Sequence, residues 1–270
     1  MKHWTLDDIP WESFDPSKVD PDLLKLAKAA ALVEKNGLDY AAYLAQVFPE
    51  DVAFKRVAEH WATEEVQHGD ALGRWAMLAD PSFDFDHAFG RFREGFHLPL
   101  DATASVRGSR AGELVARCIV EVGTSSYYAS LADATEEPVL KAICQHIAGD
   151  EIRHYNLFYA HLCRYLETEG LSRWERLKVA FGRIAETDDD ELSYAYFAAN
   201  DEGEAYNRKR CNEEYAKRAY RYYKPPIIER GIAMSLKASG FKSDGWVAAA
   251  LSKAASRFMA YRQRRLAQAA

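Results

Sequence analysis

Two short segments of this chain each place a histidine three residues after a glutamate. They are residues 64–68 (Glu-Glu-Val-Gln-His) and residues 150–154 (Asp-Glu-Ile-Arg-His). On a helix, side chains at positions i and i+3 lie on one face, one turn apart. A carboxylate and an imidazole in that arrangement can bind one metal ion. The side chains concerned are Glu65, His68, Glu151 and His154.

A further glutamate precedes each segment at nearly the same distance. Glu34 precedes Glu65 and Glu121 precedes Glu151 by intervals that differ by one residue, and both stand in apolar runs. A lone carboxylate on an apolar face is costly unless it is paired or binds a metal. The midpoints fall at Pro49-Glu50 and beside Glu137-Pro138, where a turn can open a new helix. The sequence therefore predicts two similar helical hairpins, each with a Glu opposite its Glu-x-x-His pair.

The elements that must position these residues are long helices, and no strand pattern stands out. We predict an extended arm over residues 1–20, a bundle over 21–167 and a helical C-terminal extension over 168–270 that packs on the bundle as one domain. Two hairpins joined by a long crossover have the ferritin-like topology. The predicted fold is all-α, a ferritin-like four-helix bundle with additional C-terminal helices. The predicted helices cover residues 21–47, 49–79, 83–97, 109–134, 137–167, 171–187, 190–200, 203–223, 226–239 and 244–266.

Composition narrows the class of protein. The chain has 270 residues, 48% of them hydrophobic, which is enough for a large core. The net charge of −6 does not favour general nucleic-acid binding. The four cysteines form no Cys-x-x-Cys pair, so neither a zinc ribbon nor a rubredoxin module is expected. The opening residues contain no apolar segment of a secretory signal, and no run is long enough for a membrane span, so we expect a cytoplasmic protein.

The motifs resemble those of a known family. Residues 61–70 (Trp-Ala-Thr-Glu-Glu-Val-Gln-His-Gly-Asp) are similar to the first metal motif of the soluble acyl-carrier-protein desaturases, and residues 150–154 are similar to the second. The resemblance covers about residues 25–165. It departs from the pattern at Gln67, where the plant members have Arg, and at Tyr155, where Glu is usual.

This resemblance implies a set of metal ligands. Glu65 and Glu151 would bridge two iron ions, and Glu34 and Glu121 would be terminal ligands. Manganese or a mixed manganese–iron pair is an alternative to two irons. The complete set of implied ligands is Glu34, Glu65, His68, Glu121, Glu151 and His154.

The resemblance also assigns roles beside the metals. Glu64 and Asp150 would accept hydrogen bonds from the ligand imidazoles and fix their tautomers. Tyr40 resembles the tyrosine that follows the first ligand in this family. Thr124 would place a hydroxyl near the oxygen-binding face for proton delivery, or it is a helical Thr bonded to an upstream carbonyl. Trp61 is a packing residue or part of an electron route.

The function that these residues imply is an O₂-dependent di-iron oxidase, a desaturase or a hydroxylase, that acts on an aliphatic, carrier-bound acyl chain. Electrons would come from a ferredoxin or a similar donor. Basic segments at 205–224 and 253–265 either dock the acidic carrier or donor, or are solvated helix faces. Other functions remain open: a hydroxylase of a modified tRNA base or an amine, or a ferroxidase that handles iron. A homodimer is possible.

Overall fold

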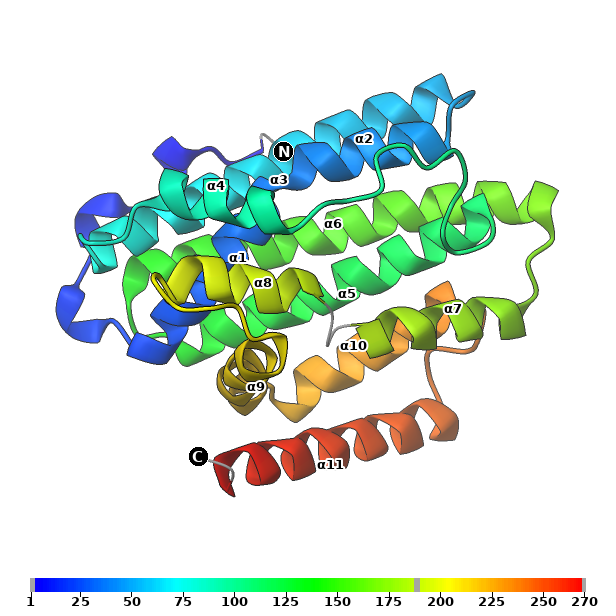
Figure 1. Cartoon of the computed structure of the whole chain (residues 1–270). Helices are drawn as coiled ribbons and strands as arrows, with labels where there is room; N and C mark the ends of the chain where they lie inside the picture. Colours follow the sequence, from blue (N-terminus) through cyan, green and yellow to red (C-terminus); the bar gives the residue numbers. More distant parts are fainter. Residues whose placement is uncertain (1–2, 187–189, 269–270) are drawn as a thin grey trace. The chain divides into compact units, whose positions relative to one another are not determined.

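The computed structural model describes residues 3–186 and 190–268 (Figure 1). Every regular element in these residues is helical, as the sequence predicts. The α-helices are α1 (Pro21–Lys35), α2 (Gly37–Val47), α3 (Val52–Ala79), α4 (Phe85–Gly95), α5 (Arg110–Ala134), α6 (Pro138–Glu169), α7 (Arg173–Ala185), α8 (Asp190–Asn200), α9 (Arg208–Ala219), α10 (Pro225–Ala238) and α11 (Trp246–Gln268). Short 3-10 turns are η1 (Leu6–Asp8), η2 (Trp11–Ser13), η3 (Pro16–Lys18) and η5 (Tyr220–Tyr222).

The predicted helix over residues 21–47 is broken at Asn36, between α1 and α2. The Asn36 N–H donates to the carbonyl of Val33 at 3.1 Å, so the helix tightens to an i→i−3 bond at this point. Gly37 then packs so closely on α3 that an added Cβ would lie 2.6 Å from the Cβ of Glu65. Asn and Gly are both weak helix formers, and the close contact with α3 decides the outcome.

Other boundaries differ by a few residues from the prediction. Both predicted turns are present, since α2 ends at Val47 and α5 ends at Ala134. Asp51, and not Pro49, caps α3 by accepting a hydrogen bond from the N–H of Phe54. The arm over residues 1–20 is less extended than predicted, because it contains three 3-10 turns. Residue 187, where one predicted helix ends, lies outside the described residues.

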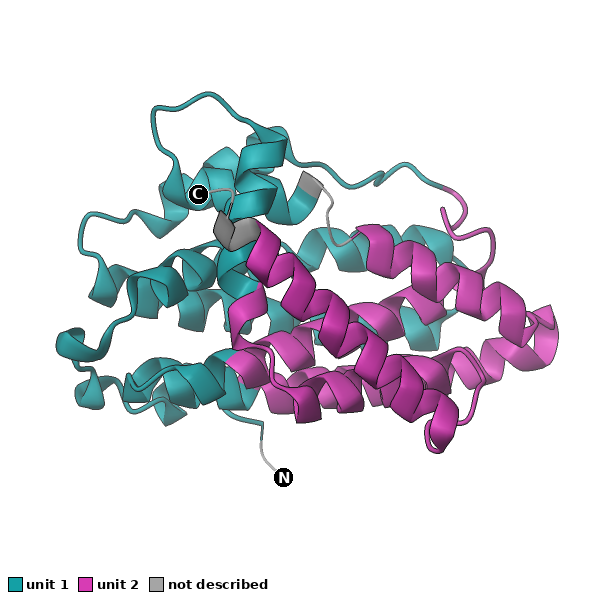
Figure 2. Ribbon diagram, turned by 90° about the horizontal axis from the view of Figure 1, so that it is seen from below, with its two compact units in different colours: residues 1–102, 131–146, 188–219 teal, residues 103–130, 147–187, 220–270 magenta. Residues whose placement is uncertain are grey.

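Contacts divide the chain into two compact units (Figure 2). Unit 1 comprises residues 1–102, 131–146 and 188–219, and unit 2 comprises residues 103–130, 147–187 and 220–270. Residues of the predicted C-terminal extension therefore occur in both units, together with residues of the predicted bundle. The division into an arm, a bundle and an extension stays a prediction.

Unit 1 is built around α1, which packs against both α3 and α8. Asp20 caps α1 by accepting hydrogen bonds from the N–H groups of Asp22 and Leu23, and Pro21 occupies the first helical position. Gly69 lies at a close contact between α1 and α3, because an added Cβ there would lie 2.9 Å from the carbonyl oxygen of Ala31. A glycine at this position thus sets the short spacing between the two helices.

A buried carboxylate in unit 1 holds three segments together. Glu137 accepts hydrogen bonds from the indole N–H of Trp75 at 2.7 Å, from the N–H of Leu140 at 2.7 Å and from the N–H of Asp15 at 3.2 Å. It therefore caps the start of α6 and also ties that start to α3 and to the N-terminal arm. Three donors compensate for the cost of burying the charge.

Unit 2 contains the facing parts of α5 and α6. The Glu169 carboxylate, at the end of α6, accepts a hydrogen bond from the N–H of Ala111 at the start of α5 at 2.7 Å, so the two helices run antiparallel. The buried Tyr155 of α6 donates its hydroxyl to the carbonyl of Met234 on α10 at 2.9 Å. The helix α11 packs in turn on α10.

Within the described part of the chain, none of the helices combines the length and the apolar character that a bilayer crossing requires.

Candidate metal centre

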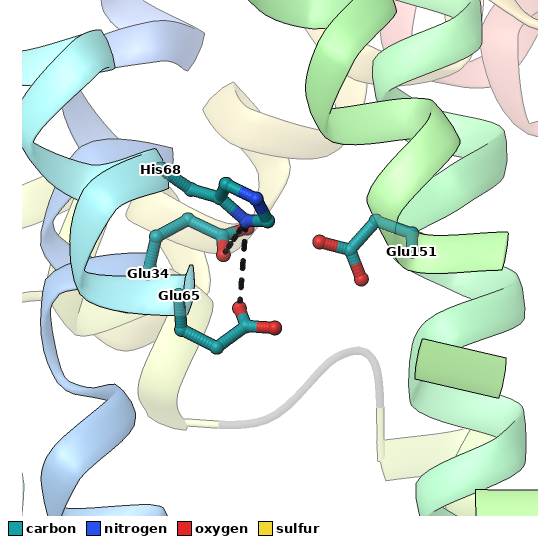
Figure 3. Close-up of side chains that lie close together, drawn as sticks. All are labelled: Glu34, Glu65, His68 and Glu151. Carbon is teal, nitrogen blue, oxygen red and sulfur yellow. Dashed lines mark ion pairs between the residues drawn. The ribbon is translucent and has the colours of Figure 1, made fainter. Parts of the chain in front are cut away.

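Three predicted ligands of unit 1 lie together, and we call Glu34, Glu65 and His68 the first triad. The Nδ1 atom of His68 lies 3.6 Å from a carboxylate oxygen of Glu34 and 3.9 Å from one of Glu65. Figure 3 shows the two carboxylates pointing at the imidazole of His68. Glu34 comes from α1, and Glu65 comes from α3 together with His68. All three residues are buried, and His68 completely so.

The other three predicted ligands lie together in unit 2, and we call Glu121, Glu151 and His154 the second triad. The Nδ1 atom of His154 lies 3.7 Å from a carboxylate oxygen of Glu121 on α5 and 3.8 Å from one of Glu151 on α6. Each of the three is only 1% exposed. The second triad therefore has the composition, the burial and nearly the distances of the first.

The triads fit the demands of a metal ion. Ligand atoms bound to one ion at about 2.0–2.2 Å lie at most roughly 4.4 Å apart. The carboxylate-to-imidazole distances of 3.6–3.9 Å meet that limit, and within each triad the possible ligand atoms lie within 4.8 Å of one another. Two carboxylates and one imidazole form an oxygen-rich set that suits Fe(II) or Mn(II). Each triad is a buried cluster that could hold a metal ion.

The second triad carries a carboxyl group that resists ionisation. Burial and the neighbouring charge of Glu151 together raise the pKa of Glu121 from 4.5 to about 8, while His154 opposes the shift. The metal-free protein therefore keeps a proton on Glu121 at neutral pH. A cation bound at this position would lower the pKa of Glu121 again, because it would compensate the buried negative charge of the carboxylate.

We predict that metal binding to the second triad is strongly pH-dependent. An ion must displace the Glu121 proton, so its affinity should rise about tenfold per pH unit up to about pH 8, with about one proton released per ion at pH 7. Titrations at several pH values in weak buffer would measure both quantities. A flat affinity over pH 6–8 would contradict this prediction.

The raised pKa of Glu121 also determines how the stability of the metal-free protein changes with pH. The carboxyl pKa is raised in the folded chain, so the unfolded state loses its proton near pH 4.5 and the folded state loses it only near pH 8. Between these values the unfolded state binds fewer protons, and the stability of the metal-free protein should fall as the pH rises. Bound metal should abolish that dependence.

Thr124 touches a member of the second triad. Its hydroxyl lies 2.6 Å from a carboxylate oxygen of Glu151, and 3.3 Å from the carbonyl oxygen of Val120 in the preceding helical turn. A hydroxyl can donate only one hydrogen bond, and a nearby carboxylate oxygen is a stronger acceptor than a more distant carbonyl oxygen. Thr124 thus donates to Glu151, and its contacts with the carbonyl oxygens of Val120 at 3.3 Å and Glu121 at 3.2 Å are the weaker ones.

We expect Thr124→Val to lower the metal affinity of the second triad by about tenfold, because a group that orients a ligand typically contributes at least that factor. Thr124→Ser keeps the hydroxyl and should stay close to the wild type. A metal titration of the three proteins measures the effect. Equal affinities for the Val and Ser variants would rule out this role of the hydroxyl.

The remaining predicted site residues are placed as follows. Glu64 and Asp150 are both buried, with Glu64 at 3.2 Å from Nε2 of His3 and Asp150 at 2.6 Å from the guanidinium of Arg153. Their predicted contacts with the ligand imidazoles stay a prediction. Trp61 is buried on α3, and its role in packing or in electron transfer also stays open.

Tyr40 has a partner that the sequence does not indicate. Its hydroxyl lies 2.5 Å from a carboxylate oxygen of Glu191, a buried residue of α8. Sequence reasoning missed Glu191 because α8 follows the motifs by more than thirty residues and carries no ligand spacing of its own. The contact connects α2 to α8 inside unit 1.

Trp4 is a second residue that the sequence does not reveal. Its indole is buried and stacks on the ring of His68, with 5.9 Å between centroids and 1° between planes, and on His146 at 5.0 Å. The side-chain amide of Gln67 donates to the carbonyl of Trp4 at 3.1 Å. Gln67, which departs from the desaturase pattern, therefore helps to hold the N-terminal arm over the first triad.

No protein-family model matches this chain, and a search of curated proteins gives no match either. The functional assignment therefore depends on the residues and their geometry.

Proposed function

We propose that the two triads form one dinuclear centre and that the protein is an O₂-dependent di-iron oxidase. The observation that carries this proposal is the repetition of one geometry. Each triad has two carboxylates within 3.9 Å of one imidazole nitrogen, and each is buried. A single cluster of this kind could arise for structural reasons, but two equal clusters at matching places in two helical hairpins fit a site for two metal ions.

The fold that we propose for this centre is the ferritin-like bundle, with α1, α3, α5 and α6 as its four ligand-bearing helices. In support, α1 and α5 each provide one Glu, while α3 and α6 each provide a Glu-x-x-His pair. This division of ligands is the one that carboxylate-bridged metal proteins use. The C-terminal helices are an addition to that arrangement.

Two bound irons would supply the capacity to activate O₂ and to oxidise an unactivated C–H bond. The chain's own residues would hold the carboxylates in place, with Thr124 donating to Glu151, and would keep bulk water away from a site whose ligands are 0–7% exposed. Electrons must reach this buried site from outside. Trp4, stacked on His68, is the aromatic side chain that we propose for that route.

An aliphatic acyl chain on an acidic carrier protein is the substrate that we propose, and a ferredoxin or similar protein is the proposed donor. Not all of the basic residues are equally suited to dock such partners. Arg210 pairs with Asp201 at 2.8 Å, and Arg218 pairs with Asp22 at 2.8 Å, so part of the 205–224 segment is neutralised locally. In this segment, Lys209, which is exposed, and Lys217, which is half-buried, are the better candidates for docking.

The test is a product analysis with the iron-loaded protein. It combines an electron donor, O₂ and a panel of acyl carrier proteins, and reads the acyl products by mass spectrometry. Loss of two hydrogens identifies a desaturase, and gain of one oxygen atom identifies a hydroxylase. The same mixture with the Glu151→Ala variant is the control. Iron that is merely oxidised and retained, with no product from any acyl chain, would contradict the proposed function.

A further inference from the structure

The last helix of unit 2, α11, has two unlike faces. Its inner face packs on α10, and its buried side chains there are the small Ala248 and Ser252. On the other side Trp246 is 82% exposed, Phe258 59% and Tyr261 60%. We call this side the outer face of α11. It consists of Trp246, Val247, Leu251, Lys253, Arg257, Phe258, Tyr261, Arg264 and Arg265.

The outer face is a single stripe and not a scatter of residues. At 3.6 residues per turn these side chains fall within an arc of roughly 160°. Isolated exposed apolar residues are normal on a protein surface, but this face gathers five large apolar side chains together with four cationic ones on one side of a single helix, which is typical of an interaction surface. We therefore expect the outer face of α11 to be covered by a binding partner and not by solvent alone.

The charge of this region is strongly biased. Residues 246–268 contain no Asp or Glu, and residues 220–270 contain ten basic and two acidic residues, a net charge of +8 (10 − 2). The chain as a whole carries −6. Lys253, Arg257 and Arg264 are exposed on the outer face. A partner that covers this face must therefore be anionic and must also accept aromatic rings.

A second helix of unit 2 shows the same character. On α7, Trp174 is 63% exposed and Phe181 58%, and they lie on one side of the helix at a spacing of two turns. Trp174 contacts the ring of Phe241, 5.2 Å between centroids, in the segment that leads into α11. Among the described residues, Tyr206 is the one exposed large aromatic side chain outside these two helices.

We propose that the outer face of α11 binds the surface of an anionic phospholipid membrane, with α7 as an adjacent contact. The helix would lie in the plane of the interface, with Trp246 and Phe258 entering the boundary between headgroups and acyl chains. Lys253, Arg257 and Arg264 would extend to lipid phosphate and carboxylate groups.

Two other occupants fit less well. Two-fold self-association would place the same basic patch against itself, and the like charges would repel. An acidic globular protein would match the charge, and protein interfaces also bury aromatic rings, but rings and cations that alternate along one exposed helix are more typical of a helix at a membrane interface. Trp and Tyr are enriched at the membrane interface, where one end of the ring is apolar and the other is wet. The proposal is independent of the metal centre.

The test is co-sedimentation of the full chain with lipid vesicles. We expect binding to phosphatidylcholine vesicles that contain about one third phosphatidylserine, but not to phosphatidylcholine alone, and loss of binding at high salt. Tryptophan fluorescence should shift to the blue on binding, and Trp246→Phe should remove most of that shift. Circular dichroism checks that each variant keeps its helical content.

Two variants and one control make the test specific. The triple variant Lys253→Gln, Arg257→Gln, Arg264→Gln should bind anionic vesicles on the order of a hundredfold more weakly, since each basic residue at the surface contributes roughly a fivefold factor. The variant Trp246→Ser, Phe258→Ser should bind at least about tenfold more weakly. The control replaces exposed residues of unit 1, with Leu38→Ser, Val52→Ser and Arg56→Gln, and should bind like the wild type.

Three results would overturn the proposal. The first is an absence of binding to anionic vesicles by the wild type. The second is equal binding by the wild type and both variants. The third is binding to an acyl carrier protein, or dimerisation in sedimentation velocity, that depends on these residues while vesicles are not bound.

Discussion

The Glu151→Ala protein is expected to retain at most one metal ion per chain and to form no product from O₂ and an acyl substrate. The Glu151 carboxylate lies 3.8 Å from Nδ1 of His154 and accepts a hydrogen bond from the hydroxyl of Thr124 at 2.6 Å. Its loss leaves Glu121 and His154 as two ligands, fewer than a stable site needs. We expect the rate to fall by at least about a thousandfold, and metal analysis after desalting gives the stoichiometry.

Two further variants of α6 make this result interpretable. Glu151→Gln keeps the side-chain volume but removes the charge, so it should also lose metal if the carboxylate is a ligand. Glu167→Gln removes an exposed carboxylate from the same helix and should keep the full metal content. Full occupancy in Glu151→Ala would refute the ligand assignment.

The Gly69→Ala substitution is expected to lower both the stability and the metal affinity. The added methyl carbon would lie 2.6 Å from the backbone nitrogen of Lys35 and 2.9 Å from the carbonyl oxygen of Ala31. These are backbone atoms that cannot rotate away, so α1 and α3 must separate. We expect a loss of about 1–3 kcal/mol in the free energy of unfolding. The metal affinity of the first triad should also fall, because Glu34 directly precedes Lys35 and His68 directly precedes Gly69.

The matched controls for Gly69→Ala are two helical glycines with open surroundings. An added Cβ at Gly123 of α5 or at Gly149 of α6 meets no atom within 4 Å. Alanine at these positions should raise the free energy of unfolding by about 0.5–1 kcal/mol, because it reduces the freedom of the unfolded chain. The two kinds of substitution thus have opposite signs in chemical denaturation. A gain in stability for Gly69→Ala would show that the two helices are not in close contact there.

The helices could largely be predicted from the sequence because they depend on local signals. Asp20-Pro21 and Pro138 mark helix starts by chemistry that acts within one turn. The break at Asn36 could not be predicted, since it follows from the contact of Gly37 with Glu65, far away in the sequence. The start of α3 differs for a local reason, because Asp51, which accepts a hydrogen bond from the N–H of Phe54, competes with the neighbouring Pro49 as the start of the helix.

The two triads could also be predicted, since two of the three residues in each triad lie three positions apart in the sequence. Glu65 with His68 and Glu151 with His154 follow from helical spacing, and Glu34 and Glu121 follow from the symmetry of the hairpins. Trp4 could not be found, because its contact with His68 joins an irregular arm to a helix. The sequence alone overestimates how many cations of the 205–224 segment are able to dock a partner. Arg218 pairs with Asp22, and this ion pair could not be predicted because Asp22 lies near the other end of the chain.

The most direct test of the account is the number and the coupling of the bound metal ions. The protein is loaded with Fe(II) without oxygen, desalted, analysed for iron, exposed to O₂ and then measured by Mössbauer and EPR spectroscopy. The account predicts two irons per chain that form a magnetically coupled, EPR-silent pair after oxidation. One iron per chain, or two that behave as isolated ferric ions, would contradict a dinuclear centre formed by the two triads.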